Sequence, residues 1–130
     1  MKSQYHHGHL KTDLIENAIQ IISENGSEQL SLRSLSKQCG VSHNAIYRHF
    51  ESKEKMIDCC REHVTDCLTD CLSKSIENLD YTNPDTINRL SYTYIDFFKE
   101  RPSYFSFIYH SKTFCKIVFS LDEVEGNYPP

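Results

Sequence analysis

Apolar residues recur with the spacing of an α-helix along most of the chain, and helix-breaking residues separate the runs. The first run ends at Gly26, a common helix stop, and comprises Leu10, Leu14, Ala18, Ile21 and Ile22. Two short runs follow. Ser31 can cap a helix that breaks at Cys39–Gly40, and Ser42 can cap another whose inward residues are Ala45, Ile46 and Phe50. Three helices are therefore predicted before Glu51, the last two joined by a tight turn.

Longer helices are predicted in the rest of the chain. Ser52 can cap a helix to about Leu79, with an apolar stripe of Ile57, Cys60, Val64, Cys67, Leu68, Cys71 and Leu72. Asn83 and Pro84 can start another, which ends at Arg101–Pro102 and repeats Ile87, Leu90, Tyr94, Phe97 and Phe98. Ser103 opens a sixth, aromatic-rich segment, and residues 122–130 look like a loop. The fold class predicted is all-α.

Composition agrees with a helical protein inside the cell. The 130 residues include only four Gly and four Pro, and long stretches lack both. No window approaches the roughly 18 apolar residues of a membrane span, and the polar start has no signal-peptide core. We therefore expect a cytoplasmic protein without a membrane partner, whose six cysteines are reduced and pack as small hydrophobic residues.

Charge is divided unevenly along the chain. The formal net charge is −4, yet residues 27–55 carry five basic and three acidic side chains. Residues 56–130 carry seven basic and twelve acidic side chains. Only the first of these segments is suited to meet phosphate, so the charge pattern argues against a protein that coats nucleic acid along its whole surface.

The two short helices have the pattern of a helix-turn-helix. The second would present His43, Asn44, Tyr47 and Arg48 on its outer face. A helix start with hydroxyl and amide side chains can bind phosphate while the outer face enters the major groove. A turn of this kind by itself is equally compatible with two packed helices that have a polar surface.

Three strings make the interpretation specific: Leu30–Leu35, Gly40–Phe50 and Ser52–Glu54. They resemble the signature of the TetR (tetracycline-repressor) family, in which an aromatic-x-His-Phe sequence ends the recognition helix and Lys-Glu starts a long linking helix. The resemblance is strong over residues 5–60 and weaker over 84–110. It implies a DNA-binding domain at residues 1–55 and a helical ligand-sensing and dimerisation domain, expected to be incomplete, at residues 56–130.

The resemblance also implies a DNA-binding surface. Tyr47 and Lys53 are expected to bind phosphate, although a packing role is the alternative for Tyr47. The candidates for reading bases are His43, Asn44 and Arg48, because Arg can grip guanine and Asn adenine through paired hydrogen bonds. The surface is completed by residues at the helix starts, on the second helix and at the groove edge: Ser31, Ser42, Arg33 and His49.

Aromatic residues after the linking helix exceed what one small core needs. Most are expected in the core, and some are expected to line an apolar cavity for an unknown small-molecule effector. The candidates are Tyr92, Tyr104, Phe105, Ile108 and Tyr109.

Other chemistry is weakly represented. His63 lies four residues after Cys59 and four before Cys67, a possible metal spacing, but no CxxC pair occurs and the cysteines follow the apolar stripe. A Cys67–Cys71 thiol sensor is disfavoured because i and i+4 positions are too far apart for a disulfide. We predict no metal site and no cofactor, and no motif indicates an enzyme.

The function predicted is a ligand-responsive transcriptional regulator, most simply a repressor, that binds a palindromic operator in double-stranded DNA as a homodimer. Two rivals stay open at this point. One is a helical protein–protein adaptor that uses the aromatic surface of residues 84–110, and the other is a small helical enzyme.

Overall fold

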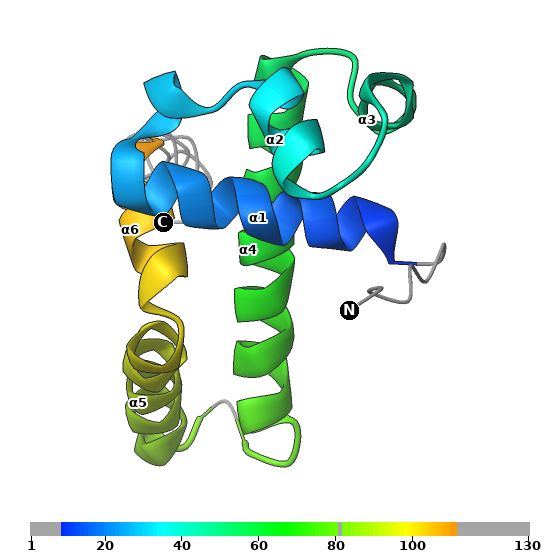
Figure 1. Ribbon diagram of the computed structural model, residues 1–130. Helices are drawn as coiled ribbons and strands as arrows, with labels where there is room; N and C mark the ends of the chain where they lie inside the picture. Colours follow the sequence, from blue (N-terminus) through cyan, green and yellow to red (C-terminus); the bar gives the residue numbers. More distant parts are fainter. Residues whose placement is uncertain (1–8, 81, 112–130) are drawn as a thin grey trace, which may run out of the picture.

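The computed structural model describes residues 9–80 and 82–111, and every regular element in those ranges is helical (Figure 1). The predicted all-α fold is confirmed. In chain order the elements are α1 (Leu10–Asn25), the short 3-10 helix η1 (Ser27–Gln29), α2 (Leu32–Gln38), α3 (His43–His49), α4 (Lys53–Ile76), α5 (Pro84–Glu100) and α6 (Pro102–His110).

The long helix α4 runs the length of the molecule and packs against α1 and α5 (Figure 1). Helix α5 returns alongside α4, and α6 continues from α5 towards α1, which crosses α4. Helices α2 and α3 pack on each other at the end of α4 where that helix begins. Helix α1 contacts α2, α4 and α6, and it therefore joins the short helices to the long ones across the predicted domain boundary near residue 55.

A single hydrophobic core runs through these contacts. It combines the inward faces of α1 and α2 with the first half of α4 and the ends of α5 and α6. Its largest fully buried side chains are Phe50, Phe97, Phe107, Leu14, Ile19, Ile22, Leu30, Leu35, Ile46 and Met56. Because burial of apolar surface is the main stabilising term in folding, the packing of α1 and α6 on α4 holds the short helices in place.

Each predicted serine cap forms. The hydroxyl oxygen of Ser31 accepts from the backbone N–H of Ser34 at 3.0 Å, and that of Ser42 accepts from Ala45 at 3.1 Å. Ser52 caps α4 in the same way, 3.2 Å from its donor. The local sequence thus fixes where α2, α3 and α4 begin.

The turn between α2 and α3 depends on Gly40. Its φ of +66° lies in the left-handed region, where L-residues with a Cβ are strained. Two backbone bonds close α2 across it, from Gly40 N to Lys37 O at 3.3 Å and from Val41 N to Ser36 O at 2.9 Å. This Schellman arrangement ends α2 and sends the chain directly into α3.

Two helix ends differ slightly from the prediction. Helix α4 ends at Ile76 rather than near Leu79, and a turn with a 3.0 Å bond from Leu79 N to Ile76 O follows it. Helix α6 begins at Pro102 rather than Ser103, because proline is well suited to the first position of a helix.

The predicted apolar stripe of α5 is only partly buried. Phe97 and Phe98 lie in the core, whereas Ile87 is 69 % and Tyr94 45 % exposed. Within the described residues the main packing partners of α5 are α4 and α6, so one strip of the helix is covered and a second apolar strip faces solvent.

The cysteines of α4 pack as predicted. Cys60 is fully buried, and Cys67 and Cys71 lie partly buried against the core. Burial raises the pKa of the Cys60 thiol to about 12, which leaves it protonated and unreactive at neutral pH. No helix in the described part of the chain is long and apolar enough to cross a membrane.

The left-handed turn gives a stability prediction. No atom lies within 4 Å of a Cβ placed on Gly40, so Gly40→Ala adds backbone strain without a clash. We expect it to lower the free energy of unfolding by about 1 kcal/mol, and Gly40→Asn to cost less because Asn tolerates this conformation. Urea unfolding followed by circular dichroism measures both. The neighbouring Gln38→Ala is the control and should be neutral; an equally neutral Gly40→Ala would contradict the assigned turn.

Candidate nucleic-acid interface

The outer face of α3 is a continuous polar surface. His43, Asn44, Arg48 and His49 are exposed, and Tyr47 is 46 % exposed. The rings of His43 and Tyr47 contact edge to face with 4.8 Å between their centroids. This aromatic pair restrains the phenol, which stands outward rather than packing in the core.

The opposite face of α3 anchors the helix. Ile46 is fully buried and Phe50, directly after the helix, is 1 % exposed. Lys53, predicted to bind phosphate, is the first residue of α4 and follows this anchor by three positions. The polar face of α3 is therefore carried by a helix whose other side cannot move without opening the core.

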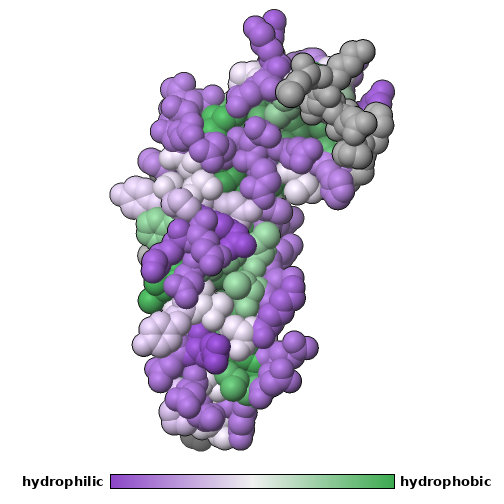
Figure 2. All heavy atoms as spheres, turned by 60° about the horizontal axis from the view of Figure 1, so that its bottom comes forward, coloured by the Kyte–Doolittle hydropathy of each residue, from purple (hydrophilic) through white to green (hydrophobic). Residues whose placement is uncertain are grey.

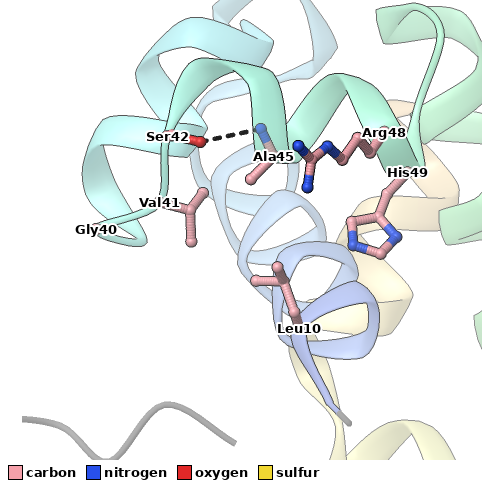
Figure 3. A pocket seen from close by; sticks show the side chains of 7 residues that line it. All are labelled: Leu10, Gly40, Val41, Ser42, Ala45, Arg48 and His49. Carbon is pink, nitrogen blue, oxygen red and sulfur yellow. Dashed lines mark hydrogen bonds between the residues drawn. The ribbon is translucent and has the colours of Figure 1, made fainter. Parts of the chain in front are cut away.

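An open hollow of about 400 Å³ separates α3 from the start of α1 (Figure 3). Leu10 of α1 forms one wall, and Val41 and Ala45 add apolar surface from the turn and from α3. Figure 3 shows the side chains of Arg48 and His49 along its rim. A hollow with an apolar wall and a guanidinium at its edge can receive a base edge or a sugar.

A second hollow lies between α2 and α3. It is lined by Arg33, Ser36 and Lys37 from α2, by His43 from α3, and by Val41 from the turn between them. Within the described residues neither Arg33, Lys37 nor Arg48 forms an ion pair, so their charges are available to a bound anion. The structure thus brings Arg33 beside the α3 residues, as the predicted surface requires.

The two serines of the predicted surface have local partners. Ser42 caps α3, and the Ser31 hydroxyl exchanges hydrogen bonds with Ser34. Both lie at helix starts and both are exposed, so each stands where a helix can offer backbone N–H groups to phosphate.

Two basic residues beside this surface, Lys37 and Lys11, were not predicted as site residues from the sequence. Lys37 follows Arg33 by four positions, which puts both side chains on one face of α2. This spacing is a sequence signal from which Lys37 could have been predicted. Lys11 belongs to α1, and its ammonium lies 6.0 Å from the ring centroid of Phe50. Only the packing of α1 against the α3 region places Lys11 there, so no local signal could have found it.

The five predicted effector residues do not share one environment. Tyr104 is buried and its hydroxyl donates to Glu16, whereas Tyr92, Phe105 and Tyr109 are 69 %, 58 % and 75 % exposed. Tyr92 lies on α5, while the others, including the half-buried Ile108, lie on α6. Their role in binding an effector stays a prediction.

Metal ligation finds no support in the described part of the chain. No group of three or more His, Cys, Asp or Glu side chains there is placed to hold a metal ion. The N-terminal histidines His6 and His7, whose imidazoles could also ligate a metal, lie outside the described residues.

These features define a helix-turn-helix DNA-binding domain: a capped recognition helix, a glycine turn, and basic residues on both sides of the exposed helix face. Residues 14–59 match the family described as "Bacterial regulatory proteins, tetR family". This segment is similar to the DNA-binding domain of TetR-family transcriptional regulators, as the sequence resemblance indicated. The match over this segment favours a DNA-binding regulator, as predicted, over an enzyme.

Curated relatives carry the name nucleoid occlusion factor SlmA. That of Actinobacillus pleuropneumoniae is 34 % identical over 80 residues, which is 62 % of this chain and 39 % of the relative. That of Haemophilus influenzae is 35 % identical over 80 residues, 62 % of this chain and 36 % of the relative. The chain thus spans less than half the length of these relatives.

Solved structures show the same fold. A putative TetR-family transcription regulator from Shewanella sp. PV-4 superposes with a TM-score of 0.70 at 19 % identity, over 75 % of this chain and 52 % of that one. A protein of unknown function from Rhodococcus sp. RHA1 gives a TM-score of 0.65 at 28 % identity, over 83 % and 56 % of the two chains.

The residues expected to read bases and those expected to bind phosphate should respond differently to mutation. Arg48→Ala and Asn44→Ala should change preference at particular base pairs, by about 1–3 kcal/mol for each pair of hydrogen bonds removed. Tyr47→Phe and Lys53→Ala should weaken binding to all duplexes alike, because phosphate contacts carry no sequence information. Fluorescence anisotropy with a panel of single-base-pair variants of one bound duplex separates the two patterns.

Lys99→Ala is the matched control, since it removes one positive charge from the exposed surface of α5. Its DNA affinity should equal that of the parent within the error of the measurement. Parent affinity in all four α3 and α4 variants would show that a different surface meets DNA.

Proposed function

We propose that this regulator acts by inserting α3 into the major groove of an operator half-site. The observation that carries the proposal is the two-sided construction of α3, with exposed polar residues from His43 to His49 opposite the buried Ile46 and Phe50. The major groove of B-DNA is about 12 Å wide and admits an α-helix. A rigidly anchored helix loses little conformational freedom on binding, which favours selective contacts with base edges.

We further propose that two copies bind a palindromic operator. Equivalent major-groove faces recur about 34 Å apart along the duplex, so a symmetric dimer can dock both recognition helices at once. The second apolar strip of α5 supports a further packing partner, because Ile87 and Ile95 are 69 % and 52 % exposed. In a view towards the end where α4 and α5 are joined, hydrophobic patches interrupt a mostly hydrophilic surface (Figure 2).

Control by a small molecule and repression are the remaining parts of the proposal. The aromatic residues of α5 and α6 follow the linking helix directly, so a ligand bound among them would act on α4 and α1 through existing contacts. A change in the spacing of two recognition helices would then prevent simultaneous docking. Thermal shift with amphipathic small molecules tests this part, since a ligand that binds only the folded state raises the melting temperature. We place the protein in the cytoplasm, together with the DNA it binds.

The alternative of a protein–protein adaptor is favoured by one observation, the exposure of Tyr92, Phe105 and Tyr109. Nucleoid occlusion, the role named for the relatives, is a second alternative that rests on 34 % identity over 80 residues. The basic surface around α3 favours DNA binding over a protein–protein adaptor. The match to the relatives covers only 80 residues, which favours a shared DNA-binding domain over a shared role in nucleoid occlusion.

A salt titration separates the regulator from the adaptor. The regulator's affinity for duplex DNA should fall linearly on a log–log plot, with a slope of about −0.9 for each phosphate neutralised. Arg33→Ala and Lys37→Ala should each reduce that slope by roughly one, whereas Lys99→Ala leaves it unchanged. Sequences selected from random duplexes should contain inverted half-sites if two copies dock together.

No binding at low salt would reject DNA recognition and support the adaptor. Selected sequences with a single half-site would retain DNA recognition and reject the palindromic operator.

A further inference from the structure

A polar cluster lies where α1, α4 and α6 meet. The Tyr104 hydroxyl of α6 donates to Glu16 Oε1 of α1 at 2.5 Å. The imidazole Nε2 of His63 on α4 lies 2.6 Å from the same oxygen and 3.1 Å from the Tyr104 hydroxyl. We call α1, α2 and α3 the DNA-binding unit. One carboxylate oxygen on α1 of this unit is thus shared by a group on α4 and a group on α6, which both lie outside it.

The Tyr104 phenol keeps its proton in this cluster. Burial, followed by the hydrogen bond to Glu16 and the charge of that carboxylate, raises the pKa of the Tyr104 phenol far above its ordinary range. The phenol therefore stays protonated and remains a donor to Glu16 at every physiological pH. Two further groups lie near the cluster: the Cys67 sulfur is 3.9 Å from His63 Nε2, and the positive charge of Arg101 acts to lower the pKa of Tyr104.

The Tyr104 side of the cluster is apolar, whereas the His63 and Glu16 side chains are 23 % and 43 % exposed. Tyr104 is 7 % exposed and packs beside Phe97, and its ring lies edge to face with that of His63. Apolar contacts between helices tolerate small sliding movements, whereas hydrogen bonds require a narrow range of distance and angle. The contact between α1 and α6, the most extensive helix pair in the described chain, is therefore fixed in register by Glu16 and Tyr104.

We propose that Glu16 is the positioning residue through which α6 sets the orientation of the DNA-binding unit. A displacement of α6 withdraws the Tyr104 hydroxyl and removes one donor from the Glu16 carboxylate. It thereby loosens α1, together with α2, which packs on α1, and α3, which packs on α2. The state of α6 thus reaches the recognition helix through α1 directly, in addition to any movement of α4. The consequence for DNA affinity rests on the proposed function, whereas the mechanical link does not.

Hydrogen–deuterium exchange of the full 130-residue chain without DNA tests the mechanical link. Tyr104→Phe and Glu16→Ala should each raise amide exchange in α1, α2 and α3 by about fivefold, the equilibrium effect of removing one hydrogen bond. The double variant should exchange no faster than Glu16→Ala alone, because both changes break the same bond. Glu16→Gln keeps an oxygen acceptor for the Tyr104 hydroxyl and should restore exchange to near the parent rate.

Tyr94→Phe, which removes an exposed tyrosine hydroxyl from α5, is the control and should match the parent. The proposal is overturned if Tyr104→Phe raises exchange in α6 alone, if the two single changes are additive, or if Glu16→Gln behaves like Glu16→Ala. Circular dichroism checks that each variant is folded; an unfolded Glu16→Ala leaves the comparison of Tyr104→Phe with Glu16→Gln to decide.

DNA affinity of the same variants separates this inference from the proposed function. Weaker DNA binding by Tyr104→Phe, with parent affinity in Tyr94→Phe, supports both the inference and the proposed function. If the parent does not bind DNA while exchange responds as described, the link stands and the proposed function fails. If the parent binds DNA and exchange in α1 to α3 does not respond, the function stands and the link is rejected.

Discussion

The structure depends on the burial of α1 between the short helices and the long ones. Leu14, Ala18 and Ile22 are all fully buried, and the helix contacts α2, α4 and α6. The helices α2 and α3 have seven residues each, too short to be stable without tertiary packing. Their position relative to the rest of the chain is therefore the position that α1 and the beginning of α4 impose on them.

Helix α3 separates the residues that hold it from the residues that can meet a ligand. Ile46 and Phe50 fix the helix, and the side chains on the other face have few partners within the protein. The start of α3 is fixed by Ser42 and the preceding turn by Gly40, neither of which requires a distant contact. Variation on the exposed face can then change what the helix binds at little cost to folding, because exposed substitutions usually change stability only slightly.

The second half of the described chain is less completely packed. Helix α5 covers α4 with one strip and leaves Ile87, Tyr94 and Ile95 exposed, in a chain that spans less than half the length of its curated relatives. Helix α6 is different, since Phe107 is fully buried and Tyr104 hydrogen-bonds to α1. The connection to the helix-turn-helix therefore runs through α6 and the first half of α4, while α5 packs on α4 and keeps an apolar strip exposed.

The sequence by itself determined the local events: the serine caps of α2, α3 and α4, the glycine turn, the polar outer face of α3 and the family resemblance. Each of these depends on residues within about four positions of one another, and helical spacing makes such patterns visible. The tertiary structure alone decided that Lys11 lies beside Phe50 and that one strip of α5 is exposed. It also decided that Glu16 meets His63 and Tyr104, which are 47 and 88 positions away. Polar contacts at such separations leave no periodic signal, because they arise only when the packing of whole helices brings the side chains together.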